Sequence, residues 1–174
     1  MANKLRFGLI FALIATYTTA IANEKILFVC TGNTGRSVMA EYYANDYAQK
    51  KNLDIKATSA GVNVDPKDIK PEKNAKVVMN QQGINIKDHV AQQANIENLK
   101  NANLVITMTA KQKQALLKID PKATNIFTLN QCSNDGNEDI EDAYGKSVTV
   151  YEETRNEIET DIKKIYDNGG KCIN

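Results

Sequence analysis

Residues 26–37 read Ile-Leu-Phe-Val-Cys-Thr-Gly-Asn-Thr-Gly-Arg-Ser, an apolar run that leads into a short loop and then a helix-like stretch. This order predicts a buried strand, a tight turn and the first turn of a helix. Gly32 and Gly35 let successive backbone N–H groups turn inward, and the helix start adds unpaired donors and the positive end of its dipole. The stretch therefore predicts an anion-binding site.

Cys30 stands at the mouth of this loop. The donors that would hold a phosphate, Arg36 among them, would also stabilise a thiolate, so the loop predicts a nucleophile. A nucleotide-binding loop needs Gly, four residues and Gly-Lys-Ser/Thr, and here Cys30 and Arg36 replace its first glycine and its lysine. The alternative, a buried apolar thiol at a strand end, leaves residues 32–37 unexplained.

Four apolar runs alternate with longer helix-compatible segments, which indicates one α/β domain with a parallel sheet and crossover helices. In such sheets ligands bind beyond the carboxyl ends of the strands, where the loop after Cys30 lies. The charged segment 65–71 and Gln92 are interpreted as solvated, without a role. The predicted strands are 26–30, 55–60, 104–108 and 126–129, and the predicted helices are 37–50, 71–82, 96–100, 110–117 and 148–167.

The first 22 residues are typical of a secretory signal peptide, with Lys4 and Arg6, an apolar run over 7–15 and a final Ala-Ile-Ala. The apolar run is about half of the roughly 20 residues that a bilayer requires, so no stable membrane anchor is expected after cleavage. We expect a mature domain of residues 23–174 that is periplasmic or secreted.

The net charge and the histidine content argue against nucleic acid and metal ions as ligands. The formal net charge is +1, and loss of residues 1–22 would change it to −1, so no global field favours nucleic acid. His89 is the only histidine, and no Cys/His cluster has ligand spacing, so neither a metal nor another cofactor is expected.

The pattern Cys, five residues, Arg-Ser, with an internal Gly-Asn, resembles the signature of the low-molecular-weight protein tyrosine phosphatases. The resemblance covers roughly residues 24–166 and implies a flavodoxin-like four-stranded parallel sheet, order 2-1-3-4, flanked by helices. It also rests on Thr58-Ser59-Ala60-Gly61, Gly83-Ile84, His89-Val90-Ala91, Thr107-Met108 and the run 139–145, Asp-Ile-Glu-Asp-Ala-Tyr-Gly.

The resemblance implies hydrolysis of protein phosphotyrosine, or of a small aryl phosphate, through a phosphocysteine. Cys30 would be the nucleophile and Asp142 the general acid, although by sequence alone Asp142 also fits an ordinary turn aspartate. The expected phosphate-binding residues are Thr31, Gly32, Asn33, Thr34, Gly35 and Arg36.

Four further residues are expected to support this site. Ser37 is placed to donate a hydrogen bond to the thiolate. Asn33 is expected to brace the loop, and the resemblance gives it Ser59 and His89 as partners, with no proton transfer by His89. Tyr144 is interpreted as an aromatic wall for a phenyl ring, or as a packing residue.

Three positions depart from the family pattern. Gly35 stands where a second cysteine often precedes the arginine, so a protective disulfide with Cys30 is absent. Ala143 replaces a proline after the expected acid, which predicts a looser loop. Val38 replaces a proline after the loop serine and affects only the start of the helix.

Two other functions compete with this interpretation. Arsenate reductase occurs on the same fold and needs resolving thiols; Cys132 follows the last strand, but Asp139 stands seven residues on, where a partner cysteine is expected, and Cys172 is far along the chain. A non-catalytic phosphotyrosine-binding module is disfavoured because both the nucleophile and the acid positions are filled.

The three cysteines lead to opposite expectations. Export to an oxidising compartment favours one free thiol, Cys30, and one bridge. However, Cys132 is expected at the active-site edge, and the last helix would carry the chain about 30 Å away, of which residues 168–172 recover roughly 17 Å. Because bridged Cα atoms lie about 6 Å apart, we predict no bridge between Cys132 and Cys172.

Overall fold

The computed structural model describes residues 23–134, 136, 139–168 and 172. Four strands form a parallel sheet in the order β2-β1-β3-β4, which confirms the predicted α/β fold and strand order. The signal peptide predicted for residues 1–22 lies outside the described residues. The strands are β1 (Glu24–Cys30), β2 (Ile55–Gly61), β3 (Leu104–Thr107) and β4 (Ile126–Thr128).

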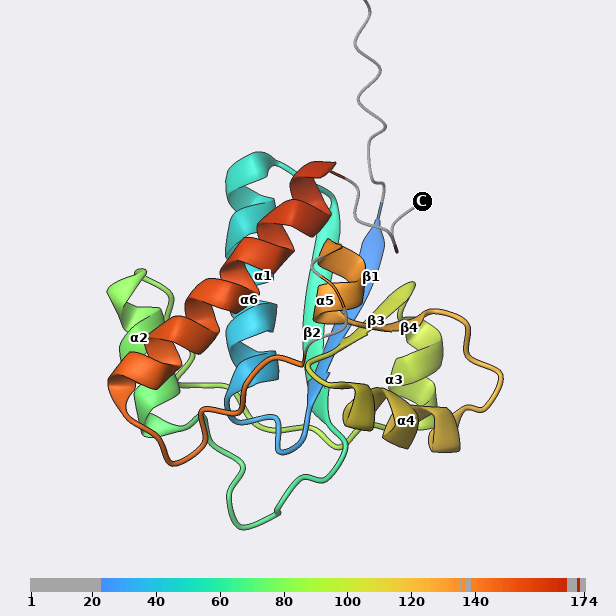
Figure 1. Cartoon of the computed structure of the whole chain (residues 1–174), viewed down its shortest axis with the longest axis horizontal. Helices are drawn as coiled ribbons and strands as arrows, with labels where there is room; N and C mark the ends of the chain where they lie inside the picture. Colours follow the sequence, from blue (N-terminus) through green and yellow to red (C-terminus); the bar gives the residue numbers. More distant parts are fainter. Residues whose placement is uncertain (1–22, 135, 137–138, 169–171, 173–174) are drawn as a thin grey trace, which may run out of the picture.

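Helices cover both faces of the sheet (Figure 1). One face carries α1 (Arg36–Lys51), α2 (Lys73–Gln81), α5 (Leu129–Ser133) and α6 (Val148–Asn168). The other face carries α3 (Ile96–Asn101) and α4 (Ala110–Ile119). None of the described helices is both long and apolar enough to cross a membrane.

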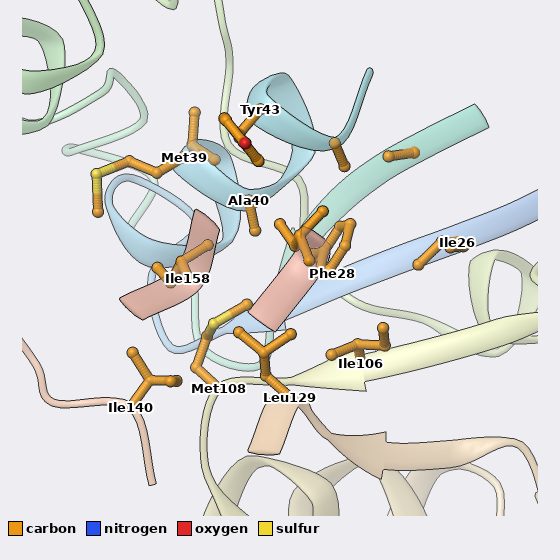
Figure 2. Close-up of a cluster of buried hydrophobic side chains, with 14 of the residues drawn as sticks. Ile26, Phe28, Met39, Ala40, Tyr43, Ile106, Met108, Leu129, Ile140 and Ile158 are labelled. Atoms are coloured by element: carbon orange, nitrogen blue, oxygen red, sulfur yellow. The ribbon is translucent and has the colours of Figure 1, made fainter. Parts of the chain in front are cut away.

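The central strand β1 explains why both faces are covered. Its side chains alternate, so that Ile26 and Phe28 pack beneath α1 and α6, while Leu27 and Val29 pack toward α3 and α4. Figure 2 shows Phe28 at the centre of the larger cluster. All four side chains are buried, and this two-sided burial fixes the position at which β1 ends and the following loop begins.

Helix ends agree with the signals in the sequence at α2. Gly83 follows the helix with φ of +75°, the left-handed conformation that glycine adopts without strain. The N–H groups of Gly83 and Ile84 return to the carbonyls of Asn80 and Met79. Pro71 lies just before the helix, which begins at Lys73 rather than at the proline.

Helix α5 was not predicted, because its first residue was assigned to the last strand. Thr128 caps the helix by accepting from the Gln131 N–H, and the Gln131 side chain returns to the Thr128 N–H. Leu129 and Cys132 are fully buried in the larger core cluster, and α5 packs against α6. The chain therefore turns into the core directly after β4.

The prediction that Cys132 and Cys172 are not bridged is wrong. They form a disulfide, with 5.2 Å between their Cα atoms. The prediction left Cys132 at the active-site edge, whereas α5 carries it into the core beside α6, within reach of the chain that follows α6. Cys30 is free, as expected, and it is the only free cysteine among the described residues because the other two are bridged.

Candidate active site

The loop after β1 passes very close to the end of β2. Cys30 is paired with Gly61 in the sheet, and a Cβ added to Gly61 would lie 2.6 Å from the Thr31 carbonyl oxygen. Glycine is therefore required for this approach. The Val62 and Asn63 N–H groups donate to the carbonyls of Cys30 and Thr31 and hold the two segments together.

Cys30 is surrounded by hydrogen-bonding groups. Its Sγ lies 3.0 Å from Ser37 Oγ and accepts from the Asn33 N–H at 3.3 Å. No side chain caps the start of α1 at Gly35, and its first turn has no acidic residue. The N–H groups and the positive end of the helix dipole are thus directed toward an anion at the loop.

Asn33 braces the loop from inside. Its φ is +57° and its side chain is fully buried. Its Nδ2 donates to Ser37 Oγ and Ser59 Oγ at 2.9 and 2.7 Å. Its Oδ1 accepts from the Gln92 N–H at 2.8 Å and lies 3.2 Å from His89 Nε2. The structure thus brings together the residues expected to support the loop. It adds the backbone N–H of Gln92, a residue that is otherwise exposed as expected.

Glu41 completes this brace and was missed from the sequence. Ser59 Oγ donates to Glu41 Oε2 at 2.5 Å, and His89 Nδ1 lies 3.7 Å from the same oxygen. Burial raises the pKa of Glu41, although the Ser59 hydrogen bond opposes this. Burial also lowers the pKa of His89. The available signal was spacing, because Glu41 follows Ser37 by four residues on one face of α1.

Arg36 connects the loop to a segment more than a hundred residues away. Its Nη1 donates to the Ile140 carbonyl at 3.0 Å and its Nη2 to Asp142 Oδ2 at 2.6 Å. The Arg36 side chain is 6% exposed and that of Asp142 is 56% exposed. Asp142 therefore lies at the open side of the site, where a leaving group would depart.

Hydrogen bonds on both sides of Ala143, which replaces a proline of the family pattern, hold the segment around Asp142 in place. Asp139 Oδ1 accepts from the Ala110 N–H at 2.7 Å, and the Ile140 N–H donates to the Met108 carbonyl at 2.9 Å. The Tyr144 N–H donates to Asp142 Oδ1 at 3.2 Å. Ala143 itself is buried in the larger core cluster. These contacts restrain the loop that was expected to be looser because Ala143 replaces the proline.

These residues surround a cavity of about 300 Å³. The segment 65–71 is mostly exposed, as expected of a solvated loop, and its Asp65 and Asp68 also contribute to the wall of this cavity. Tyr144, 64% exposed, stands at the rim. The lining residues are Cys30, Thr31, Gly32, Thr34, Gly35, Arg36, Asn63, Asp65, Asp68, Glu72, Asp142 and Tyr144.

Gln112 is a second residue that the sequence did not reveal. It is buried, and its Nε2 donates to Thr31 Oγ1 at 3.2 Å while its Oε1 accepts from the Met108 and Thr109 N–H groups. It fixes the first residue of the loop to the start of α4. Within the described ranges no three His, Cys, Asp or Glu side chains come close enough to hold a metal ion.

Residues 25–171 match the family described as low molecular weight phosphotyrosine protein phosphatase. The chain belongs to this family. It is 32% identical over 141 residues to a protein-arginine-phosphatase of Bacillus subtilis, which covers 80% of this chain and 93% of that protein. It is 28% identical to an arsenate reductase of Bacillus cereus, over 84% of this chain and 98% of that protein.

A solved member of this phosphatase family has the same architecture. The low molecular weight protein tyrosine phosphatase from T. tengcongensis superposes with a TM-score of 0.77 and 38% identity, over 83% of this chain and 99% of that one. The β1 loop, the brace at Asn33 and the segment that carries Asp142 thus lie in a domain with the fold of this family.

Proposed function

We propose that this phosphatase acts through a phosphocysteine on Cys30, with protein phosphotyrosine or a small aryl phosphate as its substrate. The observation that supports this most strongly is that Cys30, Arg36 and Asp142 line one cavity around an anion-binding loop. Phosphoryl transfer needs a nucleophile, donors for the equatorial oxygens and a proton for the leaving group.

In the first step the Cys30 thiolate attacks phosphorus while the bond to the leaving oxygen breaks. The loop N–H groups and the Arg36 guanidinium bind the three equatorial oxygens. Asp142, in its protonated form, gives its proton to the leaving oxygen. The products are phosphocysteine, the Asp142 carboxylate and the free phenol.

In the second step a water molecule attacks the phosphorus of phosphocysteine. The Asp142 carboxylate accepts the proton of that water, the P–S bond breaks, and the electron pair returns to the Cys30 sulfur as a thiolate. Ser37 Oγ and the Asn33 N–H, both already in contact with this sulfur, stabilise the departing thiolate. Inorganic phosphate then leaves the loop.

The exposed ring of Tyr144 at the cavity rim supports an aromatic substrate, because it offers a surface for a phenyl ring. A phenol, with a pKa of about 10, is also a better leaving group than an aliphatic alcohol.

Phosphoarginine in a protein is a second candidate substrate. It is favoured by four carboxylates in the cavity wall, from Asp65, Asp68, Glu72 and Asp142, against the single cation Arg36. Such a wall is suited to a guanidinium group next to the phosphoryl group. The similarity to a protein-arginine-phosphatase agrees with this.

Arsenate reduction is the alternative from another reaction class. It needs thiols that can resolve an adduct on Cys30, but Cys132 and Cys172 are bonded to each other. This alternative therefore requires prior reduction of that disulfide.

The experiment compares turnover of phosphotyrosine, phosphoserine and phosphoarginine peptides and of arsenate by the wild type, Cys30→Ser and Cys132→Ser/Cys172→Ser. We expect Cys30→Ser to bind phosphate but to lose turnover, and the double variant to retain phosphatase activity. Residual turnover in Cys30→Ser above roughly a thousandth of the wild type would exclude covalent catalysis by this residue.

A further inference from the structure

Glu72 is held directly against the phosphate-binding loop. Its backbone N–H donates to the Thr34 carbonyl at 2.9 Å, and its side chain Oε1 accepts from Thr34 Oγ1 at 3.1 Å. The residue immediately precedes α2 and lines the same cavity as Cys30. A negatively charged carboxylate thus lines a pocket whose proposed ligand is also an anion, the phosphoryl group.

Gly35 leaves room for the Glu72 carboxylate beside the loop. A Cβ added to Gly35 would lie 2.8 Å from Glu72 Oε1, so any side chain at residue 35 would compete with the carboxylate for space. The family pattern often has a cysteine at this position. With glycine at residue 35, the Glu72 carboxylate keeps this place beside the loop without being displaced.

Glu72 lies between charges of both signs: carboxylates share the catalytic cavity with it, and Lys70, Lys73 and Lys146 line the neighbouring hollow with it. Asp142 and Asp68 line the catalytic cavity with it, and Arg36 is the cation of that cavity. The Arg36 guanidinium is already bonded to Asp142. Burial raises the pKa of Glu72, with the Thr34 hydrogen bond and Arg36 opposing and the two aspartates reinforcing this shift.

An ionised Glu72 has opposite effects on the two candidate substrates. It repels a phosphoryl dianion whose leaving group is a neutral phenol, because both negative charges share a partly buried pocket. When the leaving group is a guanidinium, the positive charge next to the phosphoryl group offsets this repulsion, and its planar N–H donors match a carboxylate.

We propose that Glu72 is a specificity-determining residue. It sets the ratio of kcat/KM for substrates with a cationic leaving group to kcat/KM for substrates with a neutral one. Its carboxylate shifts this relative preference toward phosphorylated guanidinium groups and away from aryl phosphates. This inference rests on the proposed phosphatase reaction at Cys30.

The test measures kcat/KM for p-nitrophenyl phosphate and for a phosphoarginine peptide with the wild type, Glu72→Gln and Asp68→Asn. Glutamine keeps the shape of the side chain and an acceptor for Thr34. At about pH 7.5 we expect Glu72→Gln to raise kcat/KM for the aryl phosphate about tenfold and to lower it for the phosphoarginine peptide. Asp68→Asn removes one charge from the same cavity without touching the Thr34 contact, and we expect it to change the substrate ratio much less.

A second readout does not depend on turnover. Inorganic phosphate should inhibit Glu72→Gln about tenfold more tightly than the wild type at about pH 7.5, and the two proteins should converge as falling pH protonates Glu72. Equal changes for both substrates, or an equal effect of Asp68→Asn, would overturn the role of Glu72. Phosphocysteine formation on Cys30 in the same preparations separates that result from a failure of the proposed reaction.

Discussion

In the proposed reaction, the Arg36 guanidinium has two partners, the Asp142 carboxylate and the phosphoryl group of the substrate. In the free protein its Nη2 is bonded to Asp142, yet a bound phosphoryl group needs the same guanidinium fork. In the proposed reaction, substrate binding therefore has to redistribute these hydrogen bonds and release Asp142 toward the leaving group. Because Asp142 is exposed and Arg36 is buried, we expect the aspartate to be the side chain that moves.

Asp142→Ala should reveal the proton donor through its dependence on the leaving group. We expect kcat to fall by about 10² to 10⁴-fold for aryl phosphates with basic leaving groups, and much less for activated ones that depart without a proton. Steady-state kinetics over a series of substituted phenyl phosphates measures this. A uniform loss across the series would assign Asp142 a structural role instead.

His89 should make stability depend on pH. Because burial lowers the pKa of His89 below its ordinary value of 6.5, the unfolded chain binds a proton in this range that the folded chain does not. The free energy of unfolding should therefore fall as pH decreases from about 6.5 toward the lowered pKa of His89.

Urea unfolding of the wild type and His89→Gln across this range checks the prediction, and the variant should show a smaller decrease. Glu41 acts in the opposite direction, since its pKa is raised and its protonated form is favoured in the fold. An identical pH dependence in both proteins would show that His89 does not titrate as described.

Among the secondary-structure elements, those with local signals were predictable. The β1 loop was recognised because its strand, glycines, cysteine and arginine are contiguous. Glu41, Glu72 and Gln112 were not, because their contacts form only after folding. Glu72 and Gln112 reach the loop from other elements, and Glu41 contacts Ser59, which braces the loop through Asn33. Charged or amide side chains on a helix or loop do not by themselves distinguish a solvated face from a cavity wall.

The missed helix α5 led to a second wrong prediction elsewhere in the chain. Assigning Leu129 to a strand left Cys132 at the wrong edge of the sheet and led to the wrong prediction about the disulfide. The capping pair Thr128 and Gln131 was present in the sequence, but five residues are too few for a visible helical period.

The disulfide should stabilise the fold because it joins α5 to the chain after α6 across 40 residues. Cys132→Ser/Cys172→Ser should lower the free energy of unfolding by about 2–4 kcal/mol, as measured in urea without reductant. Cys30→Ser serves as the control, and added reductant should destabilise it as much as the wild type. A double variant as stable as the wild type would contradict the structural role of the bridge.

At the scale of the whole molecule, parallel strands bring distant segments to one edge. The β1 loop, the segment before α2 and the run around Asp142 meet beyond the carboxyl ends of the strands. The resemblance supplied this arrangement in outline, since strand order 2-1-3-4 cannot be derived from periodicity alone. The contacts that tune the site required the packed chain.

We propose that the protein is exported and cleaved after Ala22. The charged start and short apolar run of residues 1–22 support this, and so does the disulfide, because such bonds persist mainly in oxidising compartments. N-terminal sequencing of protein from the periplasm or medium should find Asn23 first. A chain that begins at Met1 or Ala2 would contradict export by this route.

The covalent intermediate tests the central claim most directly. Asp142→Ala should slow hydrolysis of phosphocysteine, since no carboxylate remains to accept the proton of water. We therefore expect rapid acid quenching of this variant with an activated aryl phosphate, followed by peptide mass mapping, to find one phosphoryl group on Cys30. Turnover that proceeds with no phosphoryl group on Cys30, or with the group on another residue, would contradict the account.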